Sequence, residues 1–186
     1  MNIVIAGVTC SGKTTLANSI EGASIMPLDN YFKDLFDIPK YQGRYLMDSI
    51  NAFHHGEYCQ DALELIRTGE VEIPRYDISS NRRLAKDLLI LKREIMVFEG
   101  LHTIKILSEI PSLKVFLQVD LRECLLRRIE RDSKKYGVPP KTIEEYFKEC
   151  VIPMYNEYIE PQSKMADIVV KEGEDIAWSL KKYIKR

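Results

Sequence analysis

The pattern of apolar and polar residues divides the chain into short apolar runs and longer amphipathic segments. Five apolar runs are rich in β-branched residues and bounded by turn residues, which is typical of buried parallel strands. They lie at Asn2–Ala6, Ser24–Leu28, Ile95–Phe98, Val115–Val119 and Ile168–Val170. Helical patterns that end near glycines lie between them, at Thr14–Ile20, Tyr58–Ile66 and Leu121–Lys135. This alternation predicts an α/β fold with a doubly wound, parallel five-stranded sheet.

Two sequence signals mark the starts of helices in the second half of the chain. Asp120 with Glu123, and Thr142 with Glu145, both have the spacing of a capping box. Pro153 lies inside the helical pattern that follows Thr142, and it should kink that helix because proline has no backbone N–H.

Three further segments complete the sequence-based organisation. Residues 70–77 are typical of an extended hairpin arm, whereas 84–91 are compatible with a strand or a helix by periodicity alone. A last helix is expected at Asp175–Lys185, packed against the sheet. We expect one domain over residues 1–186, with an acceptor-binding insertion at about 30–83 and a lid at about 122–142.

The composition narrows the classes of protein that this chain can belong to. At 186 residues, 45% apolar and 30% charged, it resembles an ordinary globular domain. Its 27 Lys and Arg nearly balance its 28 Asp and Glu, so neither nucleic acid nor a membrane is expected as a partner. The four scattered cysteines form no C-x-x-C pair, and the apolar N-terminus lacks a basic leader region. We therefore expect a cytoplasmic protein with reduced cysteines.

A glycine-rich loop follows the first predicted strand and opens the first predicted helix. It fits the pattern G-x-x-x-x-G-K-[ST], in which backbone amides surround a nucleotide phosphate, the lysine bridges phosphate oxygens and the next hydroxyl ligates Mg²⁺. These features predict a site for ATP and Mg²⁺. The expected ATP-binding residues are Gly7, Val8, Thr9, Cys10, Ser11, Gly12, Lys13, Thr14 and Thr15.

The motifs of other phosphate-loop proteins are absent from the sequence. No glycine has an aspartate three residues before it, as a GTPase switch requires, and neither the guanine-reading motif nor a Ser-Gly-Gly transporter signature is found. A small-molecule kinase remains, and such an enzyme needs an acid near the transferred phosphate, a second acid at the metal and cations that neutralise charge.

Two acids and a basic helix are placed to supply that chemistry. Asp29 follows the second predicted strand and Glu99 ends the third, so both should lie at the carboxyl edge of the sheet, where α/β proteins bind ligands. We expect Asp29 to be the general base and a further metal ligand, and Glu99 to hold Mg²⁺ with Thr14. Arginines at 127, 128 and 131 share a broad helix face, which is a candidate lid or simply a solvated surface.

Several blocks of sequence occur in the order known from one kinase family. They are Leu28-Asp29-Asn30-Tyr31-Phe32-Lys33-Asp34, Asp48-Ser49-Ile50-Asn51-Ala52-Phe53, Ile73-Pro74-Arg75-Tyr76-Asp77, Val97-Phe98-Glu99-Gly100-Leu101, Arg127-Arg128-Ile129-Glu130-Arg131-Asp132 and Pro161-Gln162-Ser163-Lys164-Met165-Ala166-Asp167-Ile168. From Ile3 to about Val170 the chain resembles the uridine-cytidine kinase and phosphoribulokinase family of P-loop kinases.

The resemblance implies a kinase that transfers the γ-phosphate of ATP to a hydroxyl of a nucleoside, with uridine or cytidine as the first choice. It implies that Asp29 is the base, that Asp48 binds ribose hydroxyls, and that Arg128 and Arg131 grip acceptor and phosphate. The acceptor pocket that it implies comprises Asp29, Tyr31, Phe32, Asp48, Tyr76, Asn81 and Arg128, and the catalytic set is Asp29, Lys13 and Arg131.

The chain also departs from the family pattern at the acceptor site. Asn81 stands where uridine kinases carry a base-reading histidine, and the aromatic pair Tyr31-Phe32 is inverted. Other acceptors therefore stay open: nicotinamide riboside, pantothenate, a sugar phosphate, glycerate or a nucleoside monophosphate. The lid has lost two arginines after Lys135, so a nucleotide-binding regulator without transfer activity is a further alternative. Homo-oligomerisation is also left open.

Overall fold

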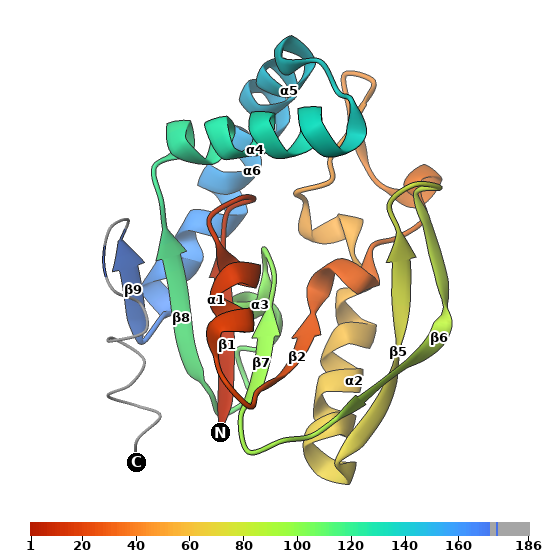
Figure 1. Ribbon diagram of the computed structural model, residues 1–186, viewed down its shortest axis with the longest axis vertical. Coiled ribbons are helices and arrows are strands. Elements are labelled where there is room, and N and C mark those ends of the chain that lie inside the picture. The colour runs from red at the N-terminus through yellow and green to blue at the C-terminus, as the bar shows by residue number, and fades with distance from the viewer. Residues whose placement is uncertain (172–173, 175–186) are drawn as a thin grey trace.

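The computed structural model describes residues 1–171 and 174, and a parallel five-stranded sheet lies at its centre (Figure 1). The strands are β1 (Asn2–Gly7), β2 (Ser24–Pro27), β7 (Met96–Glu99), β8 (Leu113–Gln118) and β9 (Ile168–Lys171). They are ordered β2-β7-β1-β8-β9, and every pairing is parallel. The α/β prediction is confirmed, with each strand ending within about two residues of its predicted limit.

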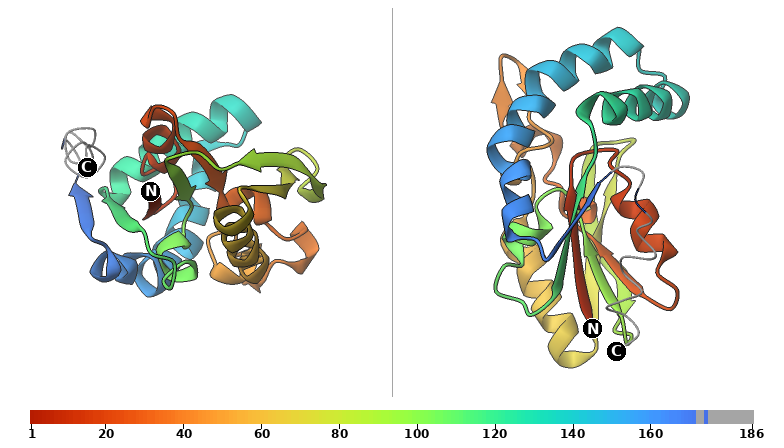
Figure 2. Two further views of the ribbon diagram at one scale, coloured as in Figure 1. Left: turned by 90° about the horizontal axis from the view of Figure 1, so that it is seen from below. Right: turned by 90° about the vertical axis from the view of Figure 1, so that its left-hand side faces the viewer.

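Helices cover both faces of this sheet (Figure 2). One face packs against α1 (Lys13–Ser19), where Ile3 and Ile5 join Leu16 in one apolar cluster. The opposite face packs against α2 (His55–Thr68) and α3 (Thr103–Ile106), and it uses the alternate strand residues, such as Val4. The sheet is therefore buried on both sides, which explains why its strands are continuous apolar runs.

A two-stranded antiparallel arm stands beside the sheet and is formed by β5 (Glu70–Asp77) and β6 (Arg82–Leu91). The segment that periodicity left undecided is therefore a strand, paired over most of its length with β5. A smaller hairpin, β3 (Lys40–Tyr41) and β4 (Arg44–Tyr45), lies nearer the top of the molecule as drawn in Figure 1. Short 3₁₀ turns connect these parts: η1 (Leu28–Tyr31), η2 (Leu35–Asp37) and η3 (Ile50–Ala52).

The helix α4 (Leu121–Tyr136) crosses above the carboxyl ends of the strands (Figure 1). Asp120 caps it as predicted, because its carboxylate accepts a hydrogen bond from the Arg122 amide at 2.7 Å. Gly137, in the left-handed region at φ 67°, ends it.

The next helix, α5 (Pro140–Tyr146), begins two residues before the predicted cap at Thr142, so that prediction was wrong. Proline at the first helical position fixes a helical φ and needs no N–H partner there, which explains the earlier start. The chain continues through the π-helical turn η4 (Phe147–Val151), α6 (Ile152–Met154), the π-helical turn η5 (Tyr155–Ile159) and the 3₁₀ segment η6 (Glu160–Met165). Pro153 is thus accommodated between two wide turns.

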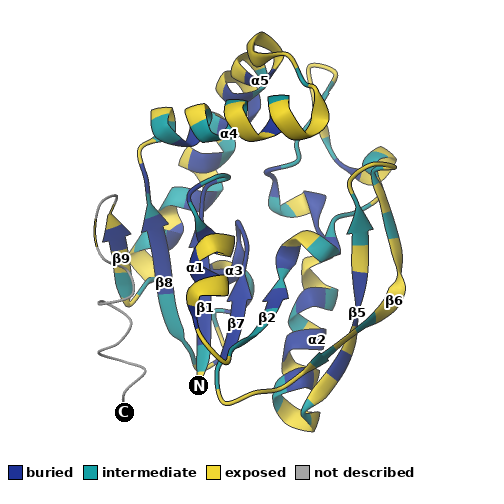
Figure 3. Cartoon of the chain, viewed as in Figure 1, coloured by how far each residue is buried: buried dark blue, intermediate teal, exposed yellow. Residues whose placement is uncertain are grey.

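Burial decreases from the sheet toward the lid helices and the arm (Figure 3). The strands β1 and β7 are almost entirely buried, whereas β6 is largely exposed. None of the described helices has the length and apolar character needed to cross a membrane. The helix expected at Asp175–Lys185 lies outside the described residues.

Candidate active site

The loop between β1 and α1 is shaped by its glycines and by one lysine. Gly7 cannot carry a side chain, because a Cβ there would lie 2.8 Å from the Leu117 carbonyl oxygen. Gly12 has a φ of 97°, a left-handed conformation that favours glycine. Lys13 folds back over the loop and donates from Nζ to the Val8 carbonyl at 2.9 Å. The loop is therefore open for phosphate oxygens at the start of α1.

The side chains of this loop form one end of a cleft of about 990 Å³. Ser11 Oγ is buried and has no hydrogen-bond partner among the described residues, so a phosphate oxygen would satisfy it. Of the nine residues expected to bind ATP, Gly7 and Val8 are buried and do not line the cleft. The other seven line it: Thr9, Cys10, Ser11, Gly12, Lys13, Thr14 and Thr15.

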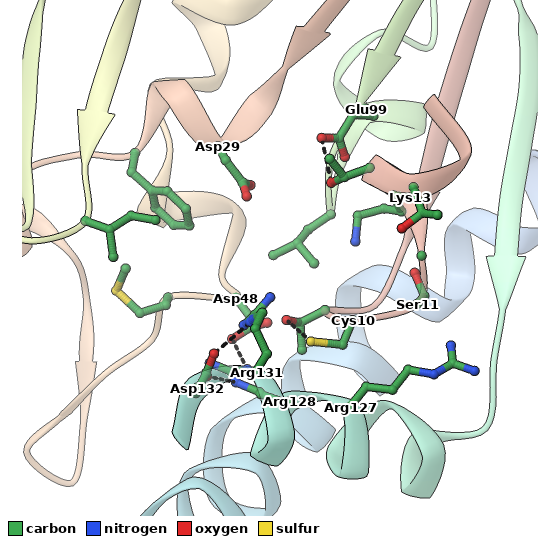
Figure 4. Close-up of a pocket in the computed structure, with 18 of the residues that line it drawn as sticks. Cys10, Ser11, Lys13, Asp29, Asp48, Glu99, Arg127, Arg128, Arg131 and Asp132 are labelled. Carbon is green, nitrogen blue, oxygen red and sulfur yellow. Dashed lines mark hydrogen bonds and ion pairs between the residues drawn. The ribbon is translucent and has the colours of Figure 1, made fainter. Parts of the chain in front are cut away.

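The two predicted acids lie together beside the loop (Figure 4). Glu99 ends β7 and accepts a hydrogen bond from Thr14 Oγ1 at 3.1 Å, while Asp29 lies in η1, directly after β2. Because β2 and β7 are neighbouring parallel strands, both acids come to the same edge of the sheet. Burial raises the pKa of Glu99 against the opposing charge of Lys13.

Asp29 is placed between the two ends of the cleft. Its side chain remains accessible to solvent within the cleft, but the surrounding protein raises its pKa, as does the charge of Asp48. The charges of Lys13 and Arg131 act in the opposite direction. The carboxylate therefore lies between Lys13 of the phosphate loop on one side and the Asp48–Arg131 group on the other.

Asp48, which follows β4 in the chain, lies beside a cluster of charged residues on the lid helix α4. Asp48 is buried and lies 3.8 Å from Arg128 Nη1, measured to its Oδ2. Asp132 orients both arginines, since it accepts from Arg128 Nε at 3.3 Å and from Arg131 Nε at 2.7 Å. The Arg128 guanidinium also lies over the ring of Tyr146, 5.2 Å from its centroid. Arg128 and Arg131 thus lie at the cleft beside Asp48, and Arg127, which also lines it, pairs with Glu123 on the same helix (Figure 4).

An aromatic wall closes the cleft on the side of the arm. The rings of Phe32 and Tyr76 lie 5.2 Å apart at 47°, and Phe53 packs behind Phe32 at 4.2 Å. Asn81 lies in the turn between β5 and β6 at φ 53°, where its carbonyl accepts a hydrogen bond from Leu35. Phe32, Tyr76 and Asn81 therefore line the cleft, where the family resemblance implies an acceptor pocket.

Tyr31 does not line the cleft, contrary to the expectation from the sequence blocks. It is fully buried, and its hydroxyl donates to Asp61 Oδ2 at 2.7 Å. Lys86 Nζ reaches the same carboxylate at 2.6 and 2.7 Å. At the end of the 3₁₀ turn η1, Phe32 lines the cleft, whereas Tyr31 turns to the interior, where its phenol shares a buried acid with Lys86.

The donor set at the loop fits a magnesium nucleotide. Among the described residues there is no cluster of three or more His, Cys, Asp and Glu side chains that could hold a metal by itself. Mg²⁺ usually takes one or two carboxylates and completes its shell with water and substrate phosphates. Thr14, Glu99 and Asp29 supply that smaller set beside Lys13, so the metal would arrive with the nucleotide.

Comparison with known proteins shows to which family the chain belongs. Residues 2–179 match the model of the phosphoribulokinase / uridine kinase family, almost the whole chain. The chain belongs to this family. A "Uridine kinase" of Halobacterium salinarum is 32% identical over 180 residues, covering 92% of this chain and 80% of that protein. A "Uridine kinase" of Staphylococcus carnosus is 31% identical over 182 residues, with 92% and 86% covered.

The same fold is found in solved structures of other proteins. A structure from Silicibacter sp. TM1040 superposes with a TM-score of 0.71 at 16% identity, covering 91% of this chain and 89% of the other. A "Possible Uridine Kinase" from Bacillus stearothermophilus has a TM-score of 0.63 at 17% identity, with 91% and 87% covered. At these identities the likeness shows the fold alone.

Two residues that support this site could not be identified from the sequence. His102 offers no signal in the sequence beyond a surface or packing role, yet it is fully buried behind Asp48. Tyr146 lies on the lid helix α5, where its hydroxyl accepts from the Met47 amide at 3.1 Å and donates to the Tyr45 carbonyl at 2.9 Å. Both act on backbone groups, which no spacing of side chains could have indicated.

Proposed function

We propose that this protein is an ATP-dependent kinase that transfers the γ-phosphate to a hydroxyl of a nucleoside, with uridine or cytidine as acceptor. The observation that carries the proposal is the position of Asp29. It lies between a phosphate loop and a cluster of Asp48, Arg128 and Arg131, in one continuous cleft. The uridine kinases among its relatives support the choice of acceptor.

Each residue of the site has a separate role in the proposed reaction. Lys13 and the amides of the loop bind the β- and γ-phosphates, and Arg131 neutralises charge on the transferred group. Thr14 and Glu99 would hold Mg²⁺, which would supply electrostatic stabilisation of the phosphate oxygens when the nucleotide is bound. Asp29 orients the acceptor hydroxyl for in-line attack and takes its proton as the new phosphorus–oxygen bond forms and the bond to ADP breaks.

The charges at the acceptor end favour a neutral acceptor over a phosphorylated one. Two guanidinium groups, of Arg128 and Arg131, face three carboxylates, of Asp29, Asp48 and Asp132. Each arginine is already paired with Asp132, and Arg128 also lies near Asp48. A sugar phosphate or a nucleoside monophosphate would bring further negative charge to this cluster. Ribose hydroxyls, in contrast, can donate to Asp48 and Asp29.

The aromatic wall favours a planar group at the other side of the acceptor. Phe32 and Tyr76 offer ring faces, and Tyr76 Oη is buried without a partner among the described residues. Asn81 presents an amide, which can both donate and accept, so it can pair with the polar edge of uracil or of cytosine. These features support a pyrimidine nucleoside over pantothenate or glycerate, which have no ring.

The test is ATP consumption with Mg²⁺ against uridine, cytidine, other ribosides, their monophosphates, pantothenate and glycerate. We expect turnover with a pyrimidine nucleoside, and Asp29→Asn should reduce kcat by at least about 100-fold because general base catalysis contributes that much. Asp37→Asn, which changes an exposed acid in the same stretch of chain, is the matched control and should retain activity. Turnover with only a different acceptor would refute the nucleoside assignment, and ATP binding without any turnover would favour the regulatory alternative.

A further inference from the structure

The segment that carries Asp48 has little regular structure of its own. It connects the small hairpin β3–β4 to the 3₁₀ turn η3 and pairs with no strand between Leu46 and Asn51. Local hydrogen bonds shape it, from Ser49 N to the Leu46 carbonyl at 3.1 Å and from Ala52 N to the Ser49 carbonyl at 3.0 Å. Something outside the segment must therefore hold the Asp48 carboxylate at its place in the cleft.

His102 reaches this segment from the side of the sheet. It follows β7 by three residues, is fully buried, and its Nε2 lies 2.8 Å from the Asp48 carbonyl oxygen. Gln162 fixes the neighbouring backbone, because its amide donates to the Leu101 carbonyl at 2.9 Å and accepts from the Lys105 amide at 3.1 Å. The imidazole is thus carried by a hydrogen-bonded segment that directly follows β7, the strand that ends at Glu99, and that leads into α3.

The environment of the ring decides which nitrogen carries the proton. Burial lowers the pKa of His102 to about 4, so the ring is neutral at physiological pH and has a single N–H. A carbonyl oxygen can only accept, so that N–H must be on Nε2. Nδ1 is left as a buried acceptor with no partner among the described residues. Burying an unpaired nitrogen lowers the stability of the folded protein, and the hydrogen bond from Nε2 to the Asp48 carbonyl offsets part of that loss.

We propose that His102 is a positioning residue for acceptor binding, which holds the Asp48 carboxylate in place through a hydrogen bond to the Asp48 backbone. The role rests on the proposed function, because Asp48 is the group that would bind the acceptor. His102 touches neither acceptor nor nucleotide in this arrangement. Its loss should therefore weaken acceptor binding, while nucleotide binding at the loop around Lys13 stays as it is.

Two substitutions separate the hydrogen bond from the packing of the ring. His102→Leu removes the donor and retains an apolar side chain of moderate size, whereas His102→Gln places an amide nitrogen near the position of Nε2. We expect the acceptor KM of His102→Leu to rise about five-fold or more, the change that corresponds to one net hydrogen bond. The ATP KM and kcat should each stay within about two-fold, and His102→Gln should recover most of the loss.

Three kinetic results would overturn the proposal. They are an unchanged acceptor KM in His102→Leu, an equal rise in both KM values, and a His102→Gln variant no better than His102→Leu. Nitrogen NMR of the wild-type protein provides a check that needs no variant to fold. A neutral ring protonated on Nε2 is expected at pH 7, and protonation on Nδ1 would refute the bond.

A measurement without acceptor keeps this proposal distinct from the proposed function. Amide hydrogen exchange at Ser49 and Ala52 should become faster in His102→Leu than in wild type, while the amides of β1 stay protected. If no pyrimidine nucleoside is phosphorylated by wild type but exchange accelerates in this pattern, the acceptor assignment falls and the positioning of the segment stands. Unchanged exchange would remove the positioning role whatever the substrate is.

Discussion

Replacing Tyr31 by Phe should destabilise the protein without affecting acceptor binding. The substitution removes one hydroxyl that donates to the buried carboxylate of Asp61 at 2.7 Å. A hydrogen bond to a charged group contributes about 1.5–3 kcal/mol. Asp61 keeps the ammonium of Lys86 at 2.6 and 2.7 Å, so it is not left unpaired. We therefore expect the lower end of that range, about 1.5 kcal/mol of unfolding free energy.

Urea unfolding and thermal melting measure this loss directly. For a chain of this length, about 1.5 kcal/mol corresponds to a fall in Tm of about 3–6 °C. Tyr41→Phe serves as the control, because Tyr41 is 54% exposed and its hydroxyl accepts a hydrogen bond from the neighbouring Gln42 at 3.3 Å. A double mutant with Asp61→Asn should lose less than the sum of the single losses, because both residues belong to one network.

The kinetics of Tyr31→Phe test independently whether the Tyr31 side chain lies outside the acceptor site. Since the phenol points away from the cleft, the acceptor KM should be unchanged, whereas Phe32→Ala should raise it by removing a ring from the aromatic wall. A Tyr31→Phe protein of normal stability with a raised acceptor KM would refute this reasoning. It would put the tyrosine at the acceptor, as the family resemblance implies.

Three more predictions follow from other contacts in the structure. Tyr146→Phe removes the hydrogen bonds to Met47 and Tyr45, and steady-state kinetics should show a higher acceptor KM at an unchanged ATP KM. Glu99→Gln should raise the Mg²⁺ concentration needed for half-maximal activity by about ten-fold, because a charged ligand becomes neutral. A magnesium titration of wild type and variant measures this shift, and an unchanged requirement would count against Glu99 as a ligand. Hydrogen bonds from the hydroxyls of Ser80 and Ser79 lower the pKa of Asp77 to about 2. The ionised carboxylate should therefore stabilise the fold above about pH 4, and this contribution should be lost as the pH falls toward 2. An Asp77→Ala protein whose acid unfolding curve matches that of wild type would contradict this.

The sheet and the phosphate loop could be predicted because their signals are local. Apolar runs buried on both sides give parallel strands, and the loop has a backbone that only Gly7 and Gly12 allow. The placement of Asp29 and Glu99 followed from the same rule, because residues after parallel strands meet at one edge. What decides these features lies within a few residues of each position.

The features that could not be predicted depend on partners far away in the sequence. The segment 84–91 is a strand because β5 pairs with it, which its own periodicity does not reveal. Tyr31 turns inward because Asp61, thirty positions later, offers it a buried acceptor. The bond from His102 to Asp48 spans 54 positions and ends on a backbone oxygen, so no residue pattern encodes it.

The contacts of the lid with the acceptor segment have a consequence for how much the site must rearrange when an acceptor binds. Tyr146 joins the two through the Met47 amide, and Arg44 of β4 joins them again through Glu149 at 2.7 Å. Arg128 stacks on the same tyrosine. The lid and the acceptor segment are therefore joined in the absence of any ligand. An acceptor meets a largely preorganised site, so little of its binding free energy is offset by ordering these groups.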